Sequence, residues 1–554
     1  MGCSASTSKN ISLPVVDASS AAPRLQHSKS SKRRFTVLLI VQGLILAHIA
    51  HWLIVRGRGG KTLAPIEPSE SIQTVTDGVI TVGAIFFVLA LFSTMILGRW
   101  FCGWGCHVVL LQDWCSILLK KVGLRPKPFR ARLLMLVPLL LGLYMFVWPL
   151  AYRFGLVPLV GWMESSLGAE HGLTTSLRGF FGFFNVPLPS SVPPLRGEWH
   201  LSEDEFWKTF PGWVVGVPFL LICGFATVYF LGAKGYCTYG CPYGGMFAPL
   251  DKYAFGRIRV NDDCEHCGHC TAVCTSNVRV HEEVAEFGMV VDPGCMKCLD
   301  CVSVCPNDAL SFGLGKPGLL KGKPKTTGVK PNWDLSWPEE IAMFVIFALC
   351  FYGSRGVYGS GVLPLLFASG VAACSTFIIW RAWRILRQKN VNFHRWRLKY
   401  RGSIQKPGML FLAGAIIIGL FGVQSVAVKS LRFAGDKYDR KVTIPRQAVL
   451  TTNPQPLPDD MSVYADRARR LYTLSSSLRR GGIGLMDDPS TSLRLAWLHA
   501  CEQEYDIAED HVRRAIEIVG PTDSLVGNSN MSCSPSKLAR SHNGSSGGMT
   551  IALW

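Results

Sequence analysis

Charged residues are scarce in this sequence. They make up 17% of the 554 residues, and the acids are scarcer than the bases, with 38 Asp and Glu against 57 Lys and Arg. An ordinary soluble domain has about a quarter of its residues charged, and a disordered chain has few hydrophobic ones. Because hydrophobic residues reach 49% here, the composition excludes a disordered chain and favours a membrane protein over a soluble globular one.

A secretory signal peptide is also lacking. The first thirty residues are polar, and no small-residue cleavage pattern follows the first apolar run. That run and six others approach the length of about 20 residues that crosses the hydrocarbon core. We therefore expect about seven membrane spans, roughly Phe35 to Val55, Gly78 to Gly98, Leu133 to Tyr152, Trp213 to Leu231, Ile341 to Tyr358, Leu363 to Trp380 and Met409 to Val428. One re-entrant hairpin is an alternative for the fifth and sixth.

Basic residues cluster before the first span, between the second and third, and between the sixth and seventh. Short loops rich in Lys and Arg stay in the cytoplasm. Seven spans then place the segment from Lys234 to Pro338 inside and everything beyond Lys429 outside. The net charge of +19 is explained by such topology signals beside anionic lipid, so we do not expect nucleic acid as a partner.

Eight of the nineteen cysteines crowd into one segment, in two copies of the spacing C-x2-C-x2-C-x3-C. Three thiolates on a tight loop take three corners of one iron–sulfur cube. The fourth, expected at the start of the next helix, reaches across to the other cube. The repeat predicts two [4Fe-4S] clusters, with Cys264, Cys267, Cys270 and Cys305 on cluster one and Cys295, Cys298, Cys301 and Cys274 on cluster two.

Other uses of these cysteines fit less well. Zinc sites usually use two separated C-x2-C pairs, and disulfides are rare in a reducing cytoplasm. One departure between the copies is Thr275 after Cys274, where the second copy has Pro306 after Cys305.

Two further C-x3-C pairs follow apolar runs. Cys102 and Cys106 close the second span, and Cys237 and Cys241 close the fourth, on the same predicted membrane face. Four thiols at one face suggest a third site. It could hold a metal or a cluster, form redox-active dithiols, or simply end the helices, and the sequence leaves these alternatives open.

The segment from about Val260 to Gly315 resembles bacterial two-cluster ferredoxin domains. Together with the C-x3-C pairs, residues 80 to 315 resemble the membrane-bound polyferredoxins of the NapH, NosR and CcoG type. In that family a proline usually follows each pair, as Pro242 does here, whereas His107 departs from the pattern. No flavin-attachment motif is apparent.

The resemblance implies a protein of the bacterial inner membrane that passes electrons between quinol or a cytoplasmic donor and a respiratory or periplasmic reductase. It implies an oxidoreductase module with no evident site of substrate turnover. Similarity to the CcoG type implies an alternative, a redox assembly or regulatory factor that matures a metalloenzyme.

The C-terminal part is polar. Leu493 to Val519 is predicted as an amphipathic helix or helix pair that resembles one tetratricopeptide repeat, with Met461 to Leu478 as a companion helix and a partner protein as its expected ligand. The predicted fold is thus an α-helical integral membrane protein with an inserted α+β ferredoxin-like domain and a small helical C-terminal region. Its predicted segments are a polar cytoplasmic N-terminus 1–34, membrane region 35–233, ferredoxin-type domain 234–338, membrane region 339–430, outer helical region 431–520 and disordered tail 521–554.

Overall fold

The computed structural model describes residues 28–56, 60–124, 126, 129–184, 186–203, 213–322, 333–356, 362–450 and 456–519. The predicted disordered tail and most of the predicted polar N-terminus lie outside the described residues. Within them the chain is mostly helical, and its strands form only small sheets of two or three strands. A mostly helical chain is what spanning a membrane requires, because a helix satisfies its backbone hydrogen bonds internally.

Four helical stretches are long and apolar enough to cross a membrane, judged by length and composition: Lys29–Val55, Leu134–Leu167, Leu365–Arg387 and Lys406–Asp439. They coincide with the first, third, sixth and seventh predicted spans. The elements concerned are α1 (Lys29–Arg56), η2 (Leu134–Leu136), α6 (Val137–Gly142), η3 (Leu143–Val147), α7 (Trp148–Leu150), η4 (Ala151–Leu156), α8 (Val157–Leu167), α18 (Val362–Arg387) and α19 (Lys406–Asp439).

The other three predicted spans are also helical but shorter. They are α3 (Val82–Leu97), the run of α10 (Trp213–Phe219), η6 (Leu220–Ala226) and α11 (Thr227–Leu231), and α17 (Trp337–Ser354). In α17 the backbone amide and hydroxyl of Ser336 both donate to Glu339 Oε2 at 3.0 Å, which fixes where the helix begins. Four spans are therefore supported by length and composition, and the total of seven stays a prediction.

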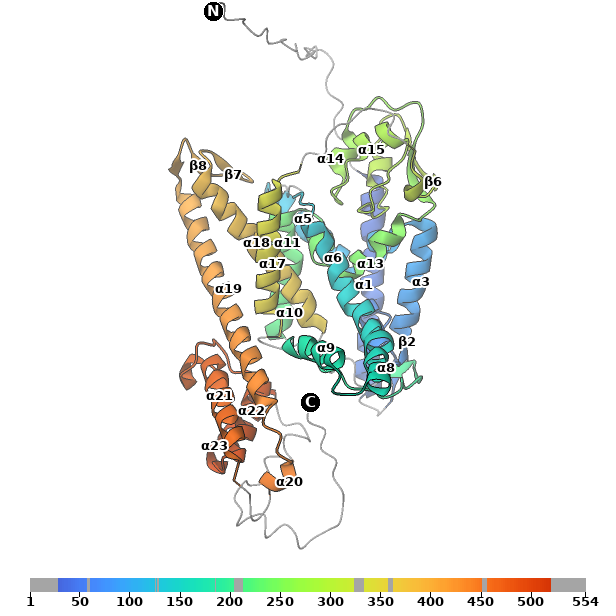
Figure 1. The fold of residues 1–554 in the computed structure, drawn as a ribbon. Coiled ribbons are helices and arrows are strands. Elements are labelled where there is room, and N and C mark those ends of the chain that lie inside the picture. The colour runs from blue at the N-terminus through green and yellow to red at the C-terminus, as the bar shows by residue number, and fades with distance from the viewer. Residues whose placement is uncertain are drawn as a thin grey trace, which may run out of the picture.

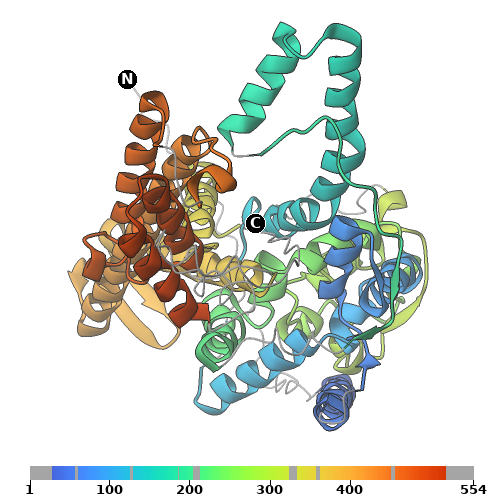
Figure 2. The same cartoon turned by 90° about the horizontal axis from the view of Figure 1, so that it is seen from below.

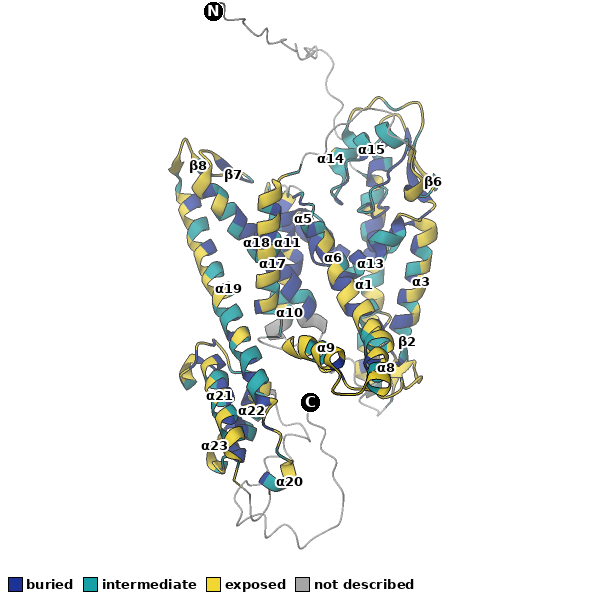
Figure 3. Cartoon of the chain, viewed as in Figure 1, coloured by how far each residue is buried: buried dark blue, intermediate teal, exposed yellow. Residues whose placement is uncertain are grey.

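The outer faces of the long helices carry apolar side chains. On α19, Leu410, Ile417 and Val423 are 77%, 68% and 71% exposed, and on α1, Leu44 is 66% exposed. Figure 3 shows exposed residues along the length of α19. Such a large exposed apolar area needs lipid around it, so the chain is a membrane protein.

The ends of the helices carry different regions. In Figure 1 a small domain lies at one end, made of β5 (Gly256–Val260), α14 (His269–Val273), α15 (Val280–Phe287), α16 (Asp300–Ser303) and β6 (Leu310–Leu314). The C-terminal helices α20 (Arg446–Val449), α21 (Asp459–Ser475), α22 (Pro489–Cys501) and α23 (Tyr505–Val519) lie at the opposite end. Seen from below, in Figure 2, the C-terminal helices lie to one side of the molecule and the N-terminal helices to the other.

The small domain is closed by β5 and β6, which pair antiparallel from Gly256 opposite Leu314 to Val260 opposite Leu310. The segment between these strands contains both cysteine motifs, and α15 separates them. Ile258, Val284 and Val290 are fully or almost fully buried in the core between strands and helices. The pairing brings the two ends of the cysteine-rich segment together.

The C-terminal region contains the expected helices. The pair predicted for Leu493 to Val519 is α22 and α23, and the companion helix is α21. Tyr472 of α21 packs against Leu495 and Leu498 of α22 in a small core. A tetratricopeptide-like role stays a prediction. A three-stranded sheet of β7 (Val391–Phe393), β8 (Trp396–Tyr400) and β9 (Ser403–Ile404) joins α18 to α19.

The remaining elements lie mainly in the connections. They are β1 (Thr62–Leu63), η1 (Pro68–Glu70), α2 (Ser71–Asp77), β2 (Ile80–Thr81), α9 (Gly172–Phe183), β3 (Trp199–His200), β4 (Ser202–Glu203), η7 (Gly318–Leu320) and η8 (Leu478–Arg480). Four short or medium helices near the small domain are described with the site below.

Candidate iron–sulfur centres

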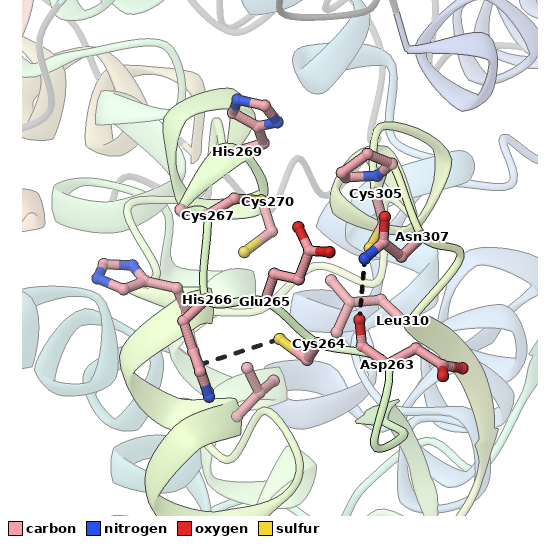
Figure 4. A pocket seen from close by; sticks show the side chains of 14 residues that line it. Asp263, Cys264, Glu265, His266, Cys267, His269, Cys270, Cys305, Asn307 and Leu310 are labelled. Atoms are coloured by element: carbon pink, nitrogen blue, oxygen red, sulfur yellow. Dashed lines mark hydrogen bonds between the residues drawn. The ribbon is translucent and has the colours of Figure 1, made fainter. Parts of the chain in front are cut away.

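Four cysteines line a pocket on the outside of the small domain. Cys264, Cys267 and Cys270 come from the first motif and Cys305 from the end of the second, and the pocket contains about 400 Å³ of empty space including its open mouth. Figure 4 shows Cys264, Cys270 and Cys305 around the same opening. Asn307 closes one side by donating from Nδ2 to the Asp263 carbonyl at 3.1 Å. These are the four residues predicted for cluster one.

The two motifs have the same backbone conformation. His266 and Gly268 have φ values of 52° and 75°, and the equivalent Lys297 and Leu299 have 50° and 62°. Three of these four residues are not glycine, so the left-handed conformation is strained and must be held by the loop. Alternating left-handed residues turn successive backbone N–H groups toward one concave side, an arrangement typical of anion and iron–sulfur sites. This repeat supports the same use for both loops.

The second set of thiols is more deeply buried. Cys295, Cys298 and Cys301 are 9%, 8% and 7% exposed. Cys301 interacts electrostatically with Cys295, Cys298 and Cys274, and also with Cys270 of the other set. Cys274 follows α14 directly, so the fourth cysteine ends one short helix and does not begin the next, contrary to the sequence prediction.

Burial changes the acidity of these thiols. It raises the pKa of Cys274 to about 12, with a further contribution from the nearby Cys295, and raises the pKa of Cys301 well above its ordinary value. The metal-free thiols are therefore protonated at neutral pH. Because only thiolates ligate iron, these residues would release protons when a cluster is inserted.

The outer pocket has the room that a cluster needs. A zinc ion holds its thiolates at about 2.3 Å. A four-iron cube is wider, so its ligands stand apart around an open space. The four thiols around the outer pocket, with the cradle of backbone N–H groups, match that requirement.

The C-x3-C pairs form a second repeated structure. In each, a short helix contains the first cysteine, and the second cysteine stands immediately before the next helix: α4 (Trp100–Trp104) and α5 (His107–Lys121), then α12 (Gly235–Tyr239) and α13 (Pro242–Asp251). Proline suits the first turn of a helix, and His107 takes in α5 the place of Pro242 in α13. The departure from the family pattern thus leaves the local fold unchanged.

The structure brings the four thiols of these pairs together. Cys241 interacts electrostatically with Cys237, Cys106 and Cys102. Cys102 and Cys237 are 9% and 8% exposed and belong to one core with Phe247. We refer to Cys102, Cys106, Cys237 and Cys241 as the membrane-face site.

Buried polar groups point at this site. Gln112 Nε2 lies 3.0 Å from Cys237 Sγ, and Arg99 Nη2 lies 4.0 Å from Cys102 Sγ. Lys234, which precedes Cys237 by three residues as Arg99 precedes Cys102, pairs with Asp113 at 2.5 Å. A buried cation near thiols favours their thiolate form and any anionic group that they hold.

Sequence reasoning missed the ion pairs around the centres. Arg34 belongs to the basic cluster before the first span, which was predicted to be a topology signal, but it is 2% exposed and pairs with Asp113 at 3.0 Å and with Asp300 at 3.3 Å. Asp251 pairs with Arg257 and with Lys297, both at 3.0 Å. The sequence does carry one signal, because Asp113 is the single acid among the basic residues between the second and third predicted spans.

Comparison with protein families agrees with this geometry. The model of a 4Fe-4S dicluster domain matches residues 257–306, which contain both four-cysteine motifs. The model of a 4Fe-4S binding domain matches twice, at residues 79–125 and 213–261, which contain the two C-x3-C pairs. The double match corresponds to the structural repeat of α4–α5 and α12–α13. No solved structure matches the chain.

Three curated proteins are similar to parts of this chain. The ferredoxin-type protein NapH of Haemophilus influenzae is 24% identical over 256 residues, which cover 45% of this chain and 74% of NapH. The methylamine utilization ferredoxin-type protein MauN of Methylorubrum extorquens is 22% identical over 262 residues, covering 45% of this chain and 75% of MauN. YccM of Escherichia coli is 30% identical over 129 residues, covering 23% of this chain and 33% of YccM.

The fold and the cysteine motifs define an iron–sulfur, ferredoxin-type electron-transfer protein of the membrane. Within that class, the family models and relatives support a NapH-type polyferredoxin, which confirms the resemblance drawn from the motifs. The matched residues leave the C-terminal helices unassigned.

Proposed function

We propose that this protein lies in the bacterial inner membrane and passes single electrons between quinol or a cytoplasmic donor and a respiratory or periplasmic reductase. Iron–sulfur clusters supply the one-electron chemistry. The observation that supports this proposal best is the placement of twelve cysteines in three groups of four, two groups in the small domain and one beneath it.

The proposed ligands follow the predicted pairing. Cys264, Cys267, Cys270 and Cys305 would hold cluster one, and Cys295, Cys298, Cys301 and Cys274 would hold cluster two. The pocket lining supports the first set, and mutual charge interactions support the second. In each set the loop backbone would donate N–H groups to the anionic cluster and so help to set its potential.

We propose a third cluster at the membrane-face site. Four converging thiols supply a complete ligand set, and the family model that matches both pairs is that of a 4Fe-4S binding domain. Cys102 and Cys237 are buried, and the buried side chains of Arg99 and Gln112 lie beside them. Buried cations of this kind would offset the negative charge of a thiolate-bound cluster.

The small domain would face the cytoplasm and the C-terminal helices the opposite side. Lys120 and Lys121 in the last turn of α5 support this orientation, because basic residues beside a membrane span stay inside. The reductase that would accept the electrons could then dock on the small domain or on the C-terminal helices. A protein partner that binds the C-terminal helices is part of the proposed function.

Metal and sulfide analysis tests the function directly. We would measure iron, zinc and acid-labile sulfide per chain on anaerobically purified, detergent-solubilised protein, with EPR spectra before and after dithionite. About twelve iron and twelve sulfide are expected, falling to about eight in the variant Cys102→Ser/Cys237→Ser. Stoichiometric zinc without sulfide would overturn electron transfer, and about eight iron in both proteins would overturn the third cluster alone.

A further inference from the structure

The loop of cluster two rests directly on the membrane-face site. A Cβ atom added at Gly103, which lies between Cys102 and Cys106, would stand 2.3 Å from the Met296 carbonyl oxygen. Trp104 Nε1 donates to the Lys297 carbonyl at 2.9 Å. The backbone that links Cys295 to Cys298 therefore touches the short helix that links Cys102 to Cys106, with no side chain between them at Gly103.

One buried ion group fixes this contact from one side. Asp251, at the end of α13, is fully buried and pairs with Lys297 of the cluster-two loop. It also accepts a hydrogen bond from the Arg99 backbone amide at 3.1 Å. The Arg99 guanidinium reaches both sides, because it donates to the Pro293 carbonyl at 2.9 Å and lies beside Cys102.

A second buried ion group fixes it from the other side. Arg34 of α1 joins Asp113 of α5 to Asp300, which follows Cys298 by two residues. Arg34 also interacts electrostatically with the Cys298 thiol. Asp113 in turn pairs with Lys234, next to the second C-x3-C pair. The positive charge of Arg34 thus links the cluster-two loop to α5, the helix that begins directly after Cys106.

The described lining of the cluster-one pocket contains no residue of the membrane helices. All residues that line its pocket lie between Asp263 and Leu310, in the small domain itself. Cys267 is exposed, and the side chains at the pocket's rim, such as Glu265 and His266, are exposed as well. These exposed side chains are accessible to a soluble molecule, and Figure 4 shows them around the pocket.

We propose that electrons pass between the membrane-face site and cluster two at the contact of the Met296–Lys297 backbone with the Gly103–Trp104 helix. Cluster one is then the end of the protein that exchanges electrons with a soluble one-electron redox protein. Arg34 is the positioning residue that couples the charges of the two sides. The inference rests on the proposed function.

The exchange is balanced as a transfer of one electron without atoms or protons. Cys295, Cys298, Cys301 and Cys274 would hold a cluster that accepts one electron, and the four cysteines of the membrane-face site would hold the group that gives it up. In the reverse direction the two sets of cysteines would exchange these roles. Quinol or the soluble redox protein supplies or removes the electron at the two ends.

The first test is an EPR-monitored redox titration of each cluster in the full-length, detergent-solubilised protein. The signal of cluster one is identified as the one lost in Cys267→Ser. Cys102→Ser removes negative charge from the membrane-face site, so the ratio of reduced to oxidised cluster two at a fixed potential should rise at least tenfold, which is about 59 mV for one electron. The same ratio for cluster one should change less than twofold. An equal shift of both clusters, or a shift of cluster one alone, overturns the proposal.

Arg34→Gln tests the coupling charge. Loss of the cation should disfavour reduced cluster two by at least tenfold, whereas Arg34→Lys should restore most of the original potential. Because Asp113 keeps Lys234 and Asp300 keeps its hydrogen bond from Ser28 at 2.9 Å, neither acid is left without a partner. An unchanged potential of cluster two in Arg34→Gln contradicts the assigned role.

Gly103→Ala tests the contact itself. Alanine favours the helix locally, but its Cβ displaces the Met296 carbonyl and so opens the contact. The change that Cys102→Ser causes in the reduced fraction of cluster two should therefore be at least threefold smaller when Gly103 is also replaced. The control is Gly313→Ala on β6, where the added Cβ meets only Arg259 Cδ at 4.0 Å, and there the full effect should persist. An undiminished effect in Gly103→Ala overturns the contact. Iron and sulfide analysis of each variant separates these outcomes from failure of the proposed function, which would appear as missing clusters in the unaltered protein.

Discussion

The carboxylate of Asp251 joins the membrane helices to the small domain, and its removal is the sharpest test of how they are held together. Asp251 is 0% exposed and is the shared anion of Arg257 and Lys297, whose side chains are 0% and 1% exposed. The substitution Asp251→Asn keeps the shape and leaves an oxygen for the Arg99 amide. It removes the counter-ion that the buried Arg257 and Lys297 share.

The expected cost follows from that imbalance. Removing one partner of a buried ion pair destabilises a protein by about 3–5 kcal/mol, because the other charge stays buried. We therefore expect Asp251→Asn to lower the free energy of unfolding by at least about 3 kcal/mol. The second substitution Lys297→Met removes one of the unpaired cations, so the double variant should recover at least about 1 kcal/mol.

The assay is equilibrium denaturation in detergent, followed by the visible absorbance of the clusters. Arg470→Gln is the control, since that side chain is 76% exposed in its pair with Asp466 and should contribute less than about 1 kcal/mol. A change below about 1 kcal/mol in Asp251→Asn, or no recovery in the double variant, would refute the reasoning.

Three further predictions concern separate parts of the chain. Burial lowers the pKa of His511 to about 4 in the folded state, so the unfolded state binds a proton at a higher pH than the folded state does. The folded C-terminal helices should therefore lose stability as the pH falls from about 6.5 toward 4. Hydrogen exchange in α22 and α23 should be faster at pH 5 than at pH 7 after correction for intrinsic rates, and His511→Gln should abolish that difference. A soluble oxidant such as ferricyanide should destroy cluster one before cluster two, because Cys267 is exposed and Cys298 is 8% exposed; EPR during iron release shows the order. Ser336→Ala removes the hydroxyl that donates to Glu339 and should cost about 1 kcal/mol, seen as a roughly fivefold loss of exchange protection in the first turn of α17.

The sequence predicted the helices and the grouping of thiols with considerable detail. Each of the seven apolar runs contains a helix in its described part, although the second begins with the strand β2 at Ile80–Thr81. Long apolar runs form helices because a helix satisfies its backbone hydrogen bonds internally in lipid. The spacing that assigned Cys305 to the first three cysteines agrees with its place in their pocket. The ligand assignment itself stays a prediction until iron is measured.

Two features could not be read from the sequence. The charge of Arg34 looked like a topology signal because its neighbours Lys32 and Arg33 carry the same charge, and only the fold shows that it alone turns inward to Asp113 and Asp300. The left-handed residues His266 and Lys297 carry no residue signature, because the preference for glycine at positive φ is overridden by the loop. In both cases the cause lies in distant packing.

These missed contacts explain why the small domain is fixed to the membrane helices. A ferredoxin domain on a flexible linker would need only a polar surface, whereas here charged side chains are buried at the contact. Buried ion pairs are a weak source of stability. Their better-attested use is to specify one arrangement among several. Asp113 is shared by Arg34 and Lys234. The arrangement that these pairs would specify is the separation of the cluster-two thiols from the thiols of the membrane-face site. A protein that moves electrons over that gap needs the distance fixed, and an ion network with a glycine at the point of contact fixes it more sharply than apolar packing alone.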